Sequence, residues 1–334
     1  MPIFVRSIAQ WNTRAVLSMI LIFALFGCSN ALPATNKPMA AATSTPTALP
    51  LYSRLFSTHY QVTFRPDVAY GRLSQEILDL CIPTGLPTPR PGLVLIHAGG
   101  WFTGDKRETF DQEQDTLQST CMGLASQGFL VASINYRLTP GATWPTQLVD
   151  AQLAVRWLRA HADTFGLDPR HICAAGLSAG AHLAVFLGVL QATHQGDEAE
   201  LLATTSPRIS CVVDFFGPVD LIQLVKTSPN TLPEVRDLLG QVKLESNPAL
   251  YRAASPLFFV SSQSAPMLII HGIQDTDVPV TQSLALQHSL QQQHVPVKYI
   301  GYEGDHLFGG LNEQQIRDIW AQVLAYLAAQ EKVQ

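Results

Sequence analysis

The stretch that decides the fold is residues 171–190, HICAAGLSAGAHLAVFLGVL. Its first residues are mostly apolar and predict a buried strand, and residues 180–190 are apolar nearly all round, which is typical of a buried helix. Between them GLSAG, at 176–180, fits the pattern G-x-S-x-G, whose glycines allow a sharp turn that exposes a serine hydroxyl at the end of a strand. Ser178 is therefore the predicted nucleophile.

Strand-like and helix-like segments alternate on both sides of this turn. Short apolar runs predict buried strands at 92–97, 129–135, 209–215, 267–271 and 297–301. Helical spacing occurs at 109–127, 145–165, 281–292 and 313–329. Such alternation predicts an α/β fold with a mostly parallel central sheet and helices on both faces. Residues 217–264 lack a clear strand and are a possible cap or helical insertion over the site.

The loop that follows the predicted strand 92–97 can stabilise negative charge. Acyl transfer places negative charge on the carbonyl oxygen, and backbone N–H groups free of bulky side chains can point at that oxygen. Gly99 and Gly100 supply two such groups, and Ala179, directly after the nucleophile, supplies a third. These three residues form the predicted oxyanion hole, and Trp101 is expected beside the acyl or alcohol pocket.

A serine nucleophile also needs a base and a carboxylate that orients the base. Asp275 follows the strand 267–271 and His306 follows the strand 297–301, in the order Ser…Asp…His that is typical of this sheet type. Asp277 is the alternative for the acid. The other histidines near these motifs are expected to have structural roles. His182 is expected in the core or as a cap, and His97 and His271, at strand ends, are expected to make backbone hydrogen bonds.

Taken together, these motifs resemble the α/β-hydrolase fold, and more closely its carboxylesterase branch, which includes hormone-sensitive-lipase-like and feruloyl-esterase-like enzymes. The resemblance covers about residues 55–330 and implies that a carboxylic ester is cleaved through an acyl-enzyme, without cofactor or metal. Ala98 and Ala181 depart from the branch, which usually has glycine at both positions. An amide hydrolase of the arylformamidase type and a non-catalytic surface binding protein remain alternatives.

The N-terminal residues have the pattern of an export signal. Two arginines precede an apolar run at 15–26, which is shorter than the roughly 20 residues of a membrane-spanning helix. The run ends in LFGC at 25–28, which resembles the lipobox of bacterial lipoproteins. We therefore expect a signal peptide at 1–27, a lipidated Cys28, a flexible tether at 28–52 and a hydrolase domain at 53–334. The chain would be exported and anchored to the bacterial cell envelope, at the outer membrane in a two-membrane cell. Cleavage nearby without lipidation, or an uncleaved anchor, is the alternative.

Composition limits the partners. The net charge of −5 argues against nucleic acid, because phosphate binding needs a basic face. A small-molecule ester is the expected partner, with membrane contact only through the lipid, and the oligomeric state stays open. Cys81, Cys121, Cys173 and Cys211 allow three complete disulfide pairings, among which the sequence does not choose. Cys173 and Cys211 lie in apolar runs and are interpreted as small core residues; none of the four has zinc-ligand spacing.

Overall fold

The computed structural model describes residues 60–108, 116–190 and 202–331. The predicted signal peptide at 1–27, the lipidation site Cys28 and the tether at 28–52 lie outside the described residues. Within the described residues, no helix is both long and apolar enough to cross a membrane.

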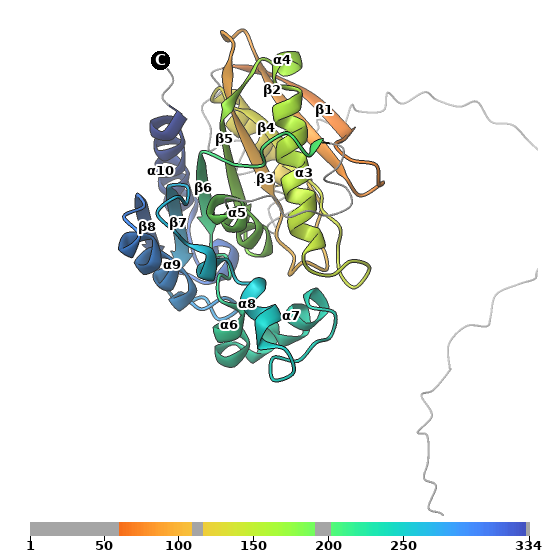
Figure 1. The fold of residues 1–334 in the computed structure, drawn as a ribbon. Coiled ribbons are helices and arrows are strands. Elements are labelled where there is room, and N and C mark those ends of the chain that lie inside the picture. The colour runs from red at the N-terminus through yellow and green to blue at the C-terminus, as the bar shows by residue number, and fades with distance from the viewer. Residues whose placement is uncertain (1–59, 109–115, 191–201, 332–334) are drawn as a thin grey trace, which may run out of the picture. The chain divides into compact units, whose positions relative to one another are not determined.

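The core of the fold is an eight-stranded sheet in the order β1-β2-β4-β3-β5-β6-β7-β8 (Figure 1). The strands are β1 (Gln61–Ala69), β2 (Ile77–Thr84), β3 (Arg90–Ile96), β4 (Leu130–Ile134), β5 (Leu167–Leu177), β6 (Cys211–Phe215), β7 (Met267–Gly272) and β8 (Val297–Tyr302). β2 is antiparallel to both β1 and β4, and all other neighbouring strands are parallel. The predicted α/β class with a mostly parallel sheet is therefore confirmed.

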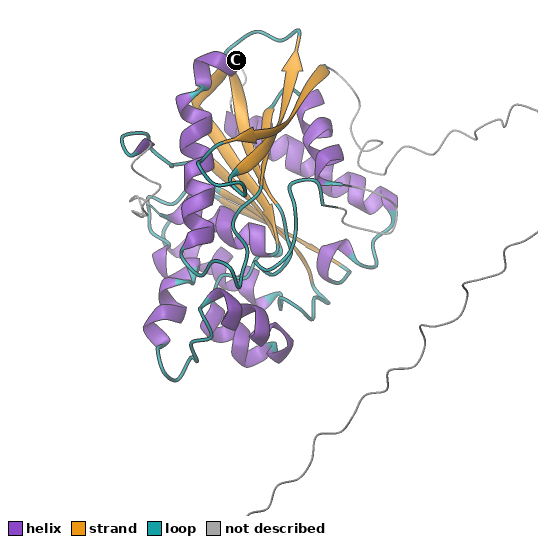
Figure 2. Cartoon of the chain, turned by 90° about the vertical axis from the view of Figure 1, so that its right-hand side faces the viewer, coloured by secondary structure: helices purple, strands orange, loops and turns teal. Residues whose placement is uncertain are grey.

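Helices cover both faces of the sheet (Figures 1 and 2). The α-helices are α2 (Leu117–Ser126), α3 (Thr146–Ala160), α4 (Ala162–Phe165), α5 (Ala179–Val189), α6 (Leu221–Thr227), α7 (Leu232–Leu238), α8 (Pro248–Ala253), α9 (Thr281–Gln292) and α10 (Glu313–Glu331). Strand side chains alternate between the faces: Val94 packs in the core under α3, α5 and α9, whereas Leu93 and Leu95 pack in the core under α2 and α10. Both faces of the central strands are thus buried, which explains their continuous apolar sequences.

The helix predicted at 109–127 is shorter in the structure. It begins at Leu117, because Thr116 caps it: the Thr116 hydroxyl accepts a hydrogen bond from the Ser119 amide at 3.0 Å, and the Ser119 hydroxyl accepts one from the Thr116 amide. Residues 109–115 lie outside the described part of the chain.

The cap segment, residues 217–264, is helical. It contains α6, α7 and α8 and two short 3₁₀ turns, at Pro229–Thr231 and Pro256–Phe259. The three helices lie together at one end of the sheet (Figure 1). Their apolar side chains form a small core of their own that also includes Trp101 and Ala179. The cap segment is therefore packed against Trp101 and against Ala179, one of the three predicted oxyanion residues.

Four cysteines form two disulfides, Cys81–Cys121 and Cys173–Cys211. Cys173 and Cys211 are opposite each other on the neighbouring strands β5 and β6, with their Cα atoms 4.6 Å apart. Both residues are fully buried in the core, as interpreted from the sequence, and the structure adds that they are bonded to each other. The sequence did not reveal the pairing because it depends on which strands are neighbours.

Candidate active site

Ser178 lies in a sharp turn between β5 and α5. Its φ of 52° and ψ of −117° are strained for a residue with a side chain, which is typical of functional turns. Glycine is required on both sides of it. A Cβ atom on Gly176 would lie 2.3 Å from the Gly180 carbonyl oxygen, and one on Gly180 would lie 2.3 Å from the Ile96 carbonyl oxygen. The G-x-S-x-G spacing is thus dictated by the close approach of helix and strand.

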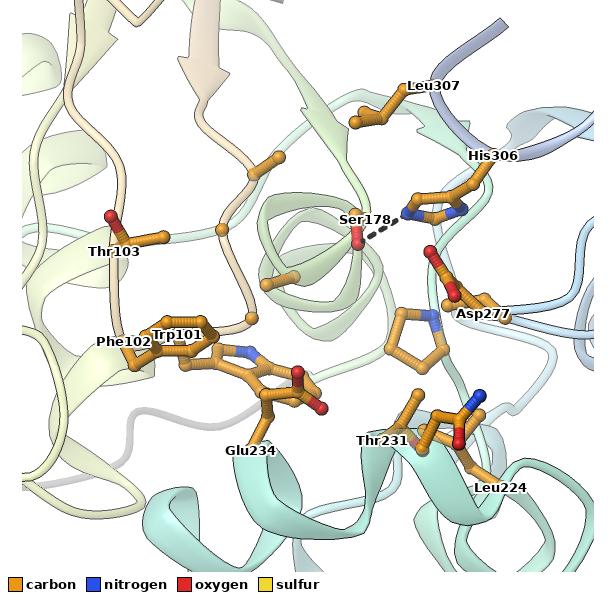
Figure 3. A pocket seen from close by; sticks show the side chains of 17 residues that line it. Trp101, Phe102, Thr103, Ser178, Leu224, Thr231, Glu234, Asp277, His306 and Leu307 are labelled. Atoms are coloured by element: carbon orange, nitrogen blue, oxygen red, sulfur yellow. Dashed lines mark hydrogen bonds between the residues drawn. The ribbon is translucent and has the colours of Figure 1, made fainter. Parts of the chain in front are cut away.

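The structure brings Ser178, Asp275 and His306 together in one hydrogen-bonded chain. The Nε2 atom of His306 lies 3.0 Å from the Ser178 Oγ atom (Figure 3), and its Nδ1 atom lies 2.6 Å from Oδ2 of Asp275. His306 begins the 3₁₀ turn His306–Phe308 after β8, and Asp275 lies in the loop after β7. Post-strand loops of a parallel sheet meet at one edge, which is why residues so distant in sequence converge.

Asp277, the alternative for the acid, occupies a different position. Its backbone amide donates a hydrogen bond to Oδ1 of Asp275 at 3.0 Å, and it lines the pocket on the same side as His306 (Figure 3). The imidazole of His306 is hydrogen-bonded to Asp275 instead. Of the two aspartates, the geometry therefore selects Asp275 as the partner of the histidine.

Asp275 is held as a carboxylate. It is only 7% exposed, and burial alone would raise its pKa. Hydrogen bonds from His271 and His306, the positive charge that His306 can carry and the Val278 amide outweigh burial, and they lower the pKa of Asp275 to about 2. The Asp275 carboxyl group is consequently ionised at neutral pH and can accept a hydrogen bond from the ring N–H of His306.

Gly99, Gly100 and Ala179 line the same pocket as Ser178. The two glycines have φ values of 103° and 57°, which favour glycine, and a Cβ atom on Gly99 would lie 2.2 Å from the Thr103 carbonyl oxygen. The structure thus places all three predicted oxyanion residues beside the serine.

This loop is tied to its surroundings on two sides. The Asn135 side chain accepts a hydrogen bond from the Lys106 amide at 2.6 Å and donates one to Asp105 at 2.8 Å. On the other side, the indole N–H of Trp101 donates to Nδ1 of His182 at 3.3 Å. Burial lowers the pKa of His182 to about 4, so its ring is neutral and can accept this bond. Trp101, as expected, lines the pocket.

The pocket in front of Ser178 has a volume of about 300 Å³ and mixes apolar and acidic groups. Its apolar lining residues include Trp101, Phe102, Pro218, Leu224, Val278 and Leu307. Glu234, from α7, and Asp277 contribute two carboxylates, and no lysine or arginine of the described residues lines it. Burial, with the charges of Asp277 and Asp237, raises the pKa of Glu234. The sequence carries no recognisable signal for Glu234, because its position depends on the packing of the cap segment.

No group of three or more His, Cys, Asp or Glu side chains that could hold a metal ion occurs in residues 60–108, 116–190 and 202–331.

The sheet, its helices and the serine turn define the α/β-hydrolase fold. A truncated carbohydrate esterase from gut microbiota has a similar structure, with a TM-score of 0.66 and 26% sequence identity, over 83% of this chain and 98% of that chain. Esterase B from Lactobacillus rhamnosis (HN001) shares the fold at a TM-score of 0.64 and 23% identity, over 83% of this chain and 88% of that chain.

Residues 78–290 match the model of the BD-FAE family, and the chain belongs to that family. It is 31% identical over 251 residues to esterase LipC of Mycobacterium tuberculosis (strain ATCC 25618 / H37Rv), which covers 73% of this chain and 59% of LipC. It is 30% identical over 228 residues to esterase LipQ of the same organism, over 67% of this chain and 52% of LipQ. The chain thus spans between half and three fifths of the length of these two relatives.

Proposed function

We propose that the chain hydrolyses small carboxylic esters through an acyl-enzyme formed on Ser178. The observation that carries this proposal is the hydrogen-bonded chain Ser178–His306–Asp275 at the wall of a pocket that Gly99 and Gly100 also line. The names of the relatives, all esterases, support an ester over the amide of an arylformamidase. The site contains a nucleophile, a base and an acid in hydrogen-bond contact, and this also favours catalysis over binding alone.

In the proposed first half-reaction, the Ser178 hydroxyl attacks the ester carbonyl while Nε2 of His306 takes its proton. The negative oxygen that results accepts hydrogen bonds from the backbone N–H groups of Gly99, Gly100 and Ala179, each typically worth about 3–4 kcal/mol of barrier. The His306 imidazolium, held by the Asp275 carboxylate, then gives its proton to the departing alcohol. In the second half-reaction, water gives a proton to His306 and attacks the acyl-enzyme. The His306 imidazolium then returns this proton to the Ser178 Oγ atom as the acyl–oxygen bond breaks, which releases the acid and restores both residues.

The direct test is hydrolysis of a series of p-nitrophenyl esters by the full chain. We expect ester turnover with an initial burst of p-nitrophenol where deacylation is slow. Lack of turnover on every acyl length would contradict the proposed function.

The two pocket carboxylates predict a preference for positively charged substrates. We expect kcat/KM for acetylthiocholine to exceed that for 3,3-dimethylbutyl thioacetate, an uncharged analogue of the same shape, by about fivefold, because Glu234 and Asp277 attract the cation across a partly solvated pocket. Glu234→Gln should bring the ratio of the two kcat/KM values closer to one. Glu245→Gln, which removes an exposed carboxylate of the cap segment outside the pocket, is the matched control and should preserve the ratio. A ratio below one, or one that Glu234→Gln leaves unchanged, would count against this assignment.

We also propose that the chain is exported and anchored to the cell envelope through a lipid on Cys28, with residues 1–27 removed as a signal peptide. The sequence of residues 15–28 carries this proposal. The two disulfides support it, because structural disulfides are typical of exported proteins and rare in a reducing cytoplasm.

Metabolic labelling of the full chain in a bacterial host with an alkyne fatty acid tests the anchor. Wild-type protein should take up the label and sediment with membranes, since multiple acyl chains bind stably. Cys28→Ser should lose the label, whereas Ser29→Ala, a change at the neighbouring residue, should keep it. Equal labelling of the wild type and Cys28→Ser, or none of either, would show that Cys28 is not lipidated.

A further inference from the structure

The candidate acid Asp275 is contacted by a second imidazole. Besides His306, the Nε2 atom of His271 lies 3.2 Å from Oδ2 of Asp275. His271 is at the end of β7 and is completely buried, so it cannot itself reach a substrate in the pocket. The sequence predicts a backbone hydrogen bond for this histidine, and its Nε2 atom does lie 2.7 Å from the Val278 carbonyl oxygen. His271 therefore contacts the acid of the hydrogen-bonded chain Ser178–His306–Asp275.

The partners of His271 fix the position of its proton. Nε2 lies 2.7 Å from the Val278 carbonyl oxygen, which can only accept a hydrogen bond, so Nε2 carries the hydrogen. Nδ1 lies 2.6 Å from the Ser283 hydroxyl, on α9, which donates to the ring nitrogen when the ring is neutral. The Nε2–H is thus shared between Val278 and the Asp275 carboxylate, and Ser283 sets the tautomer that allows this.

The surroundings keep this arrangement rigid. Ser283, like His271, is completely buried. The ring of Phe216 packs against both imidazoles, with centroid distances of 6.4 Å to His271 and 4.8 Å to His306. His271 also interacts electrostatically with Asp214 of β6, whose pKa is raised to about 7 by burial. A buried carboxylate such as Asp275, with fewer donors, would have more freedom to turn away from His306.

We propose that His271, oriented by Ser283, is a positioning residue that holds Oδ2 of Asp275 toward Nδ1 of His306. The role rests on the proposed function, in which Asp275 orients the catalytic base. It extends the hydrogen-bonded chain to five side chains: Ser283, His271, Asp275, His306 and Ser178. Such supporting contacts typically determine whether a catalytic group keeps its productive geometry.

His271→Gln and His271→Leu test the role as a pair. The amide nitrogen of glutamine can reproduce the Nε2–H donor, whereas leucine fills the space without a donor. We expect His271→Leu to lower kcat about 20-fold with KM within about twofold, the size expected for loss of one hydrogen bond to a charged group, and His271→Gln to recover most of kcat.

Ser283→Ala supplies a second and milder test if His271→Leu does not fold. It should lower kcat about threefold with KM within about twofold, whereas Ser289→Ala, on the same helix, should match the wild type. Unchanged kcat in folded His271→Leu or Ser283→Ala would overturn the proposal. So would a loss of kcat that follows thermal stability alone and that glutamine does not restore. Turnover by the wild type, with none by Ser178→Ala, would show that the proposed function survives such a failure.

Discussion

Ser178→Ala is expected to lower kcat for any accepted ester by about 10⁵- to 10⁶-fold, to the level that backbone donors and binding alone provide. Without the Oγ atom no acyl-enzyme can form, and the imidazole of His306 has no hydroxyl to deprotonate. KM should change little, because the other residues that line the pocket are unchanged. The measurement is steady-state turnover with a p-nitrophenyl ester, together with loss of the initial burst.

Two controls separate chemistry from folding in this experiment. Alanine at 178 faces the same positive φ as serine, so the free energy of unfolding should remain close to that of the wild type. His306→Ala should cost about as much as Ser178→Ala, and the double variant no more than either, because residues that act as a unit are not additive. Substantial turnover by folded Ser178→Ala, or an additive double variant, would contradict the proposed mechanism.

Asp275→Asn is expected to lower kcat about 10⁴-fold. The carboxylate accepts the Nδ1–H of His306 at 2.6 Å and so leaves the unprotonated Nε2 facing Ser178. An asparagine amide turned toward His306 would donate instead, which favours the opposite tautomer and places a hydrogen on Nε2, where the base must be free. In this variant the side chains keep their positions, but His306 carries its hydrogen on Nε2 instead of Nδ1. The measurement is kcat at a pH well above the pKa of free imidazole, where the ring is neutral and only its tautomer matters.

Asp277→Asn is the matched comparison for Asp275→Asn, since the two aspartates share one loop and the change is identical. Asp277 lines the pocket but the ring of His306 is bonded to Asp275, so we expect an effect below about tenfold, mainly on KM. If Asp277→Asn were the more damaging of the two, the assignment of the acid would have to be reversed.

The parts of the site that the sequence predicted share one physical origin. Ser178, Asp275 and His306 each follow a predicted buried strand, and strand ends of a parallel sheet meet at one edge. Local spacing was therefore sufficient to expect their convergence. The oxyanion loop was recognisable for the same reason, since Gly99 and Gly100 directly follow β3.

Other features depend on contacts between segments that no local pattern reports. The cysteine pairs depend on the packing of β5 beside β6 and of α2 against β2. The carboxylate of Glu234 reaches the pocket only because α7 packs over it. His271 had a signal that was missed: it stands four residues before Asp275, across a loop short enough to turn back on the strand. A contact between this histidine and the aspartate could therefore have been predicted from their spacing.

Mapping of the residue modified by a fluorophosphonate identifies the nucleophile, because this reagent phosphonylates an activated serine. The full chain is treated, digested and analysed by mass spectrometry. We expect one adduct, on the peptide that contains Ser178, and no adduct on Ser178→Ala or His306→Ala. No adduct on the folded wild-type chain, or an adduct on a different serine, would contradict this expectation.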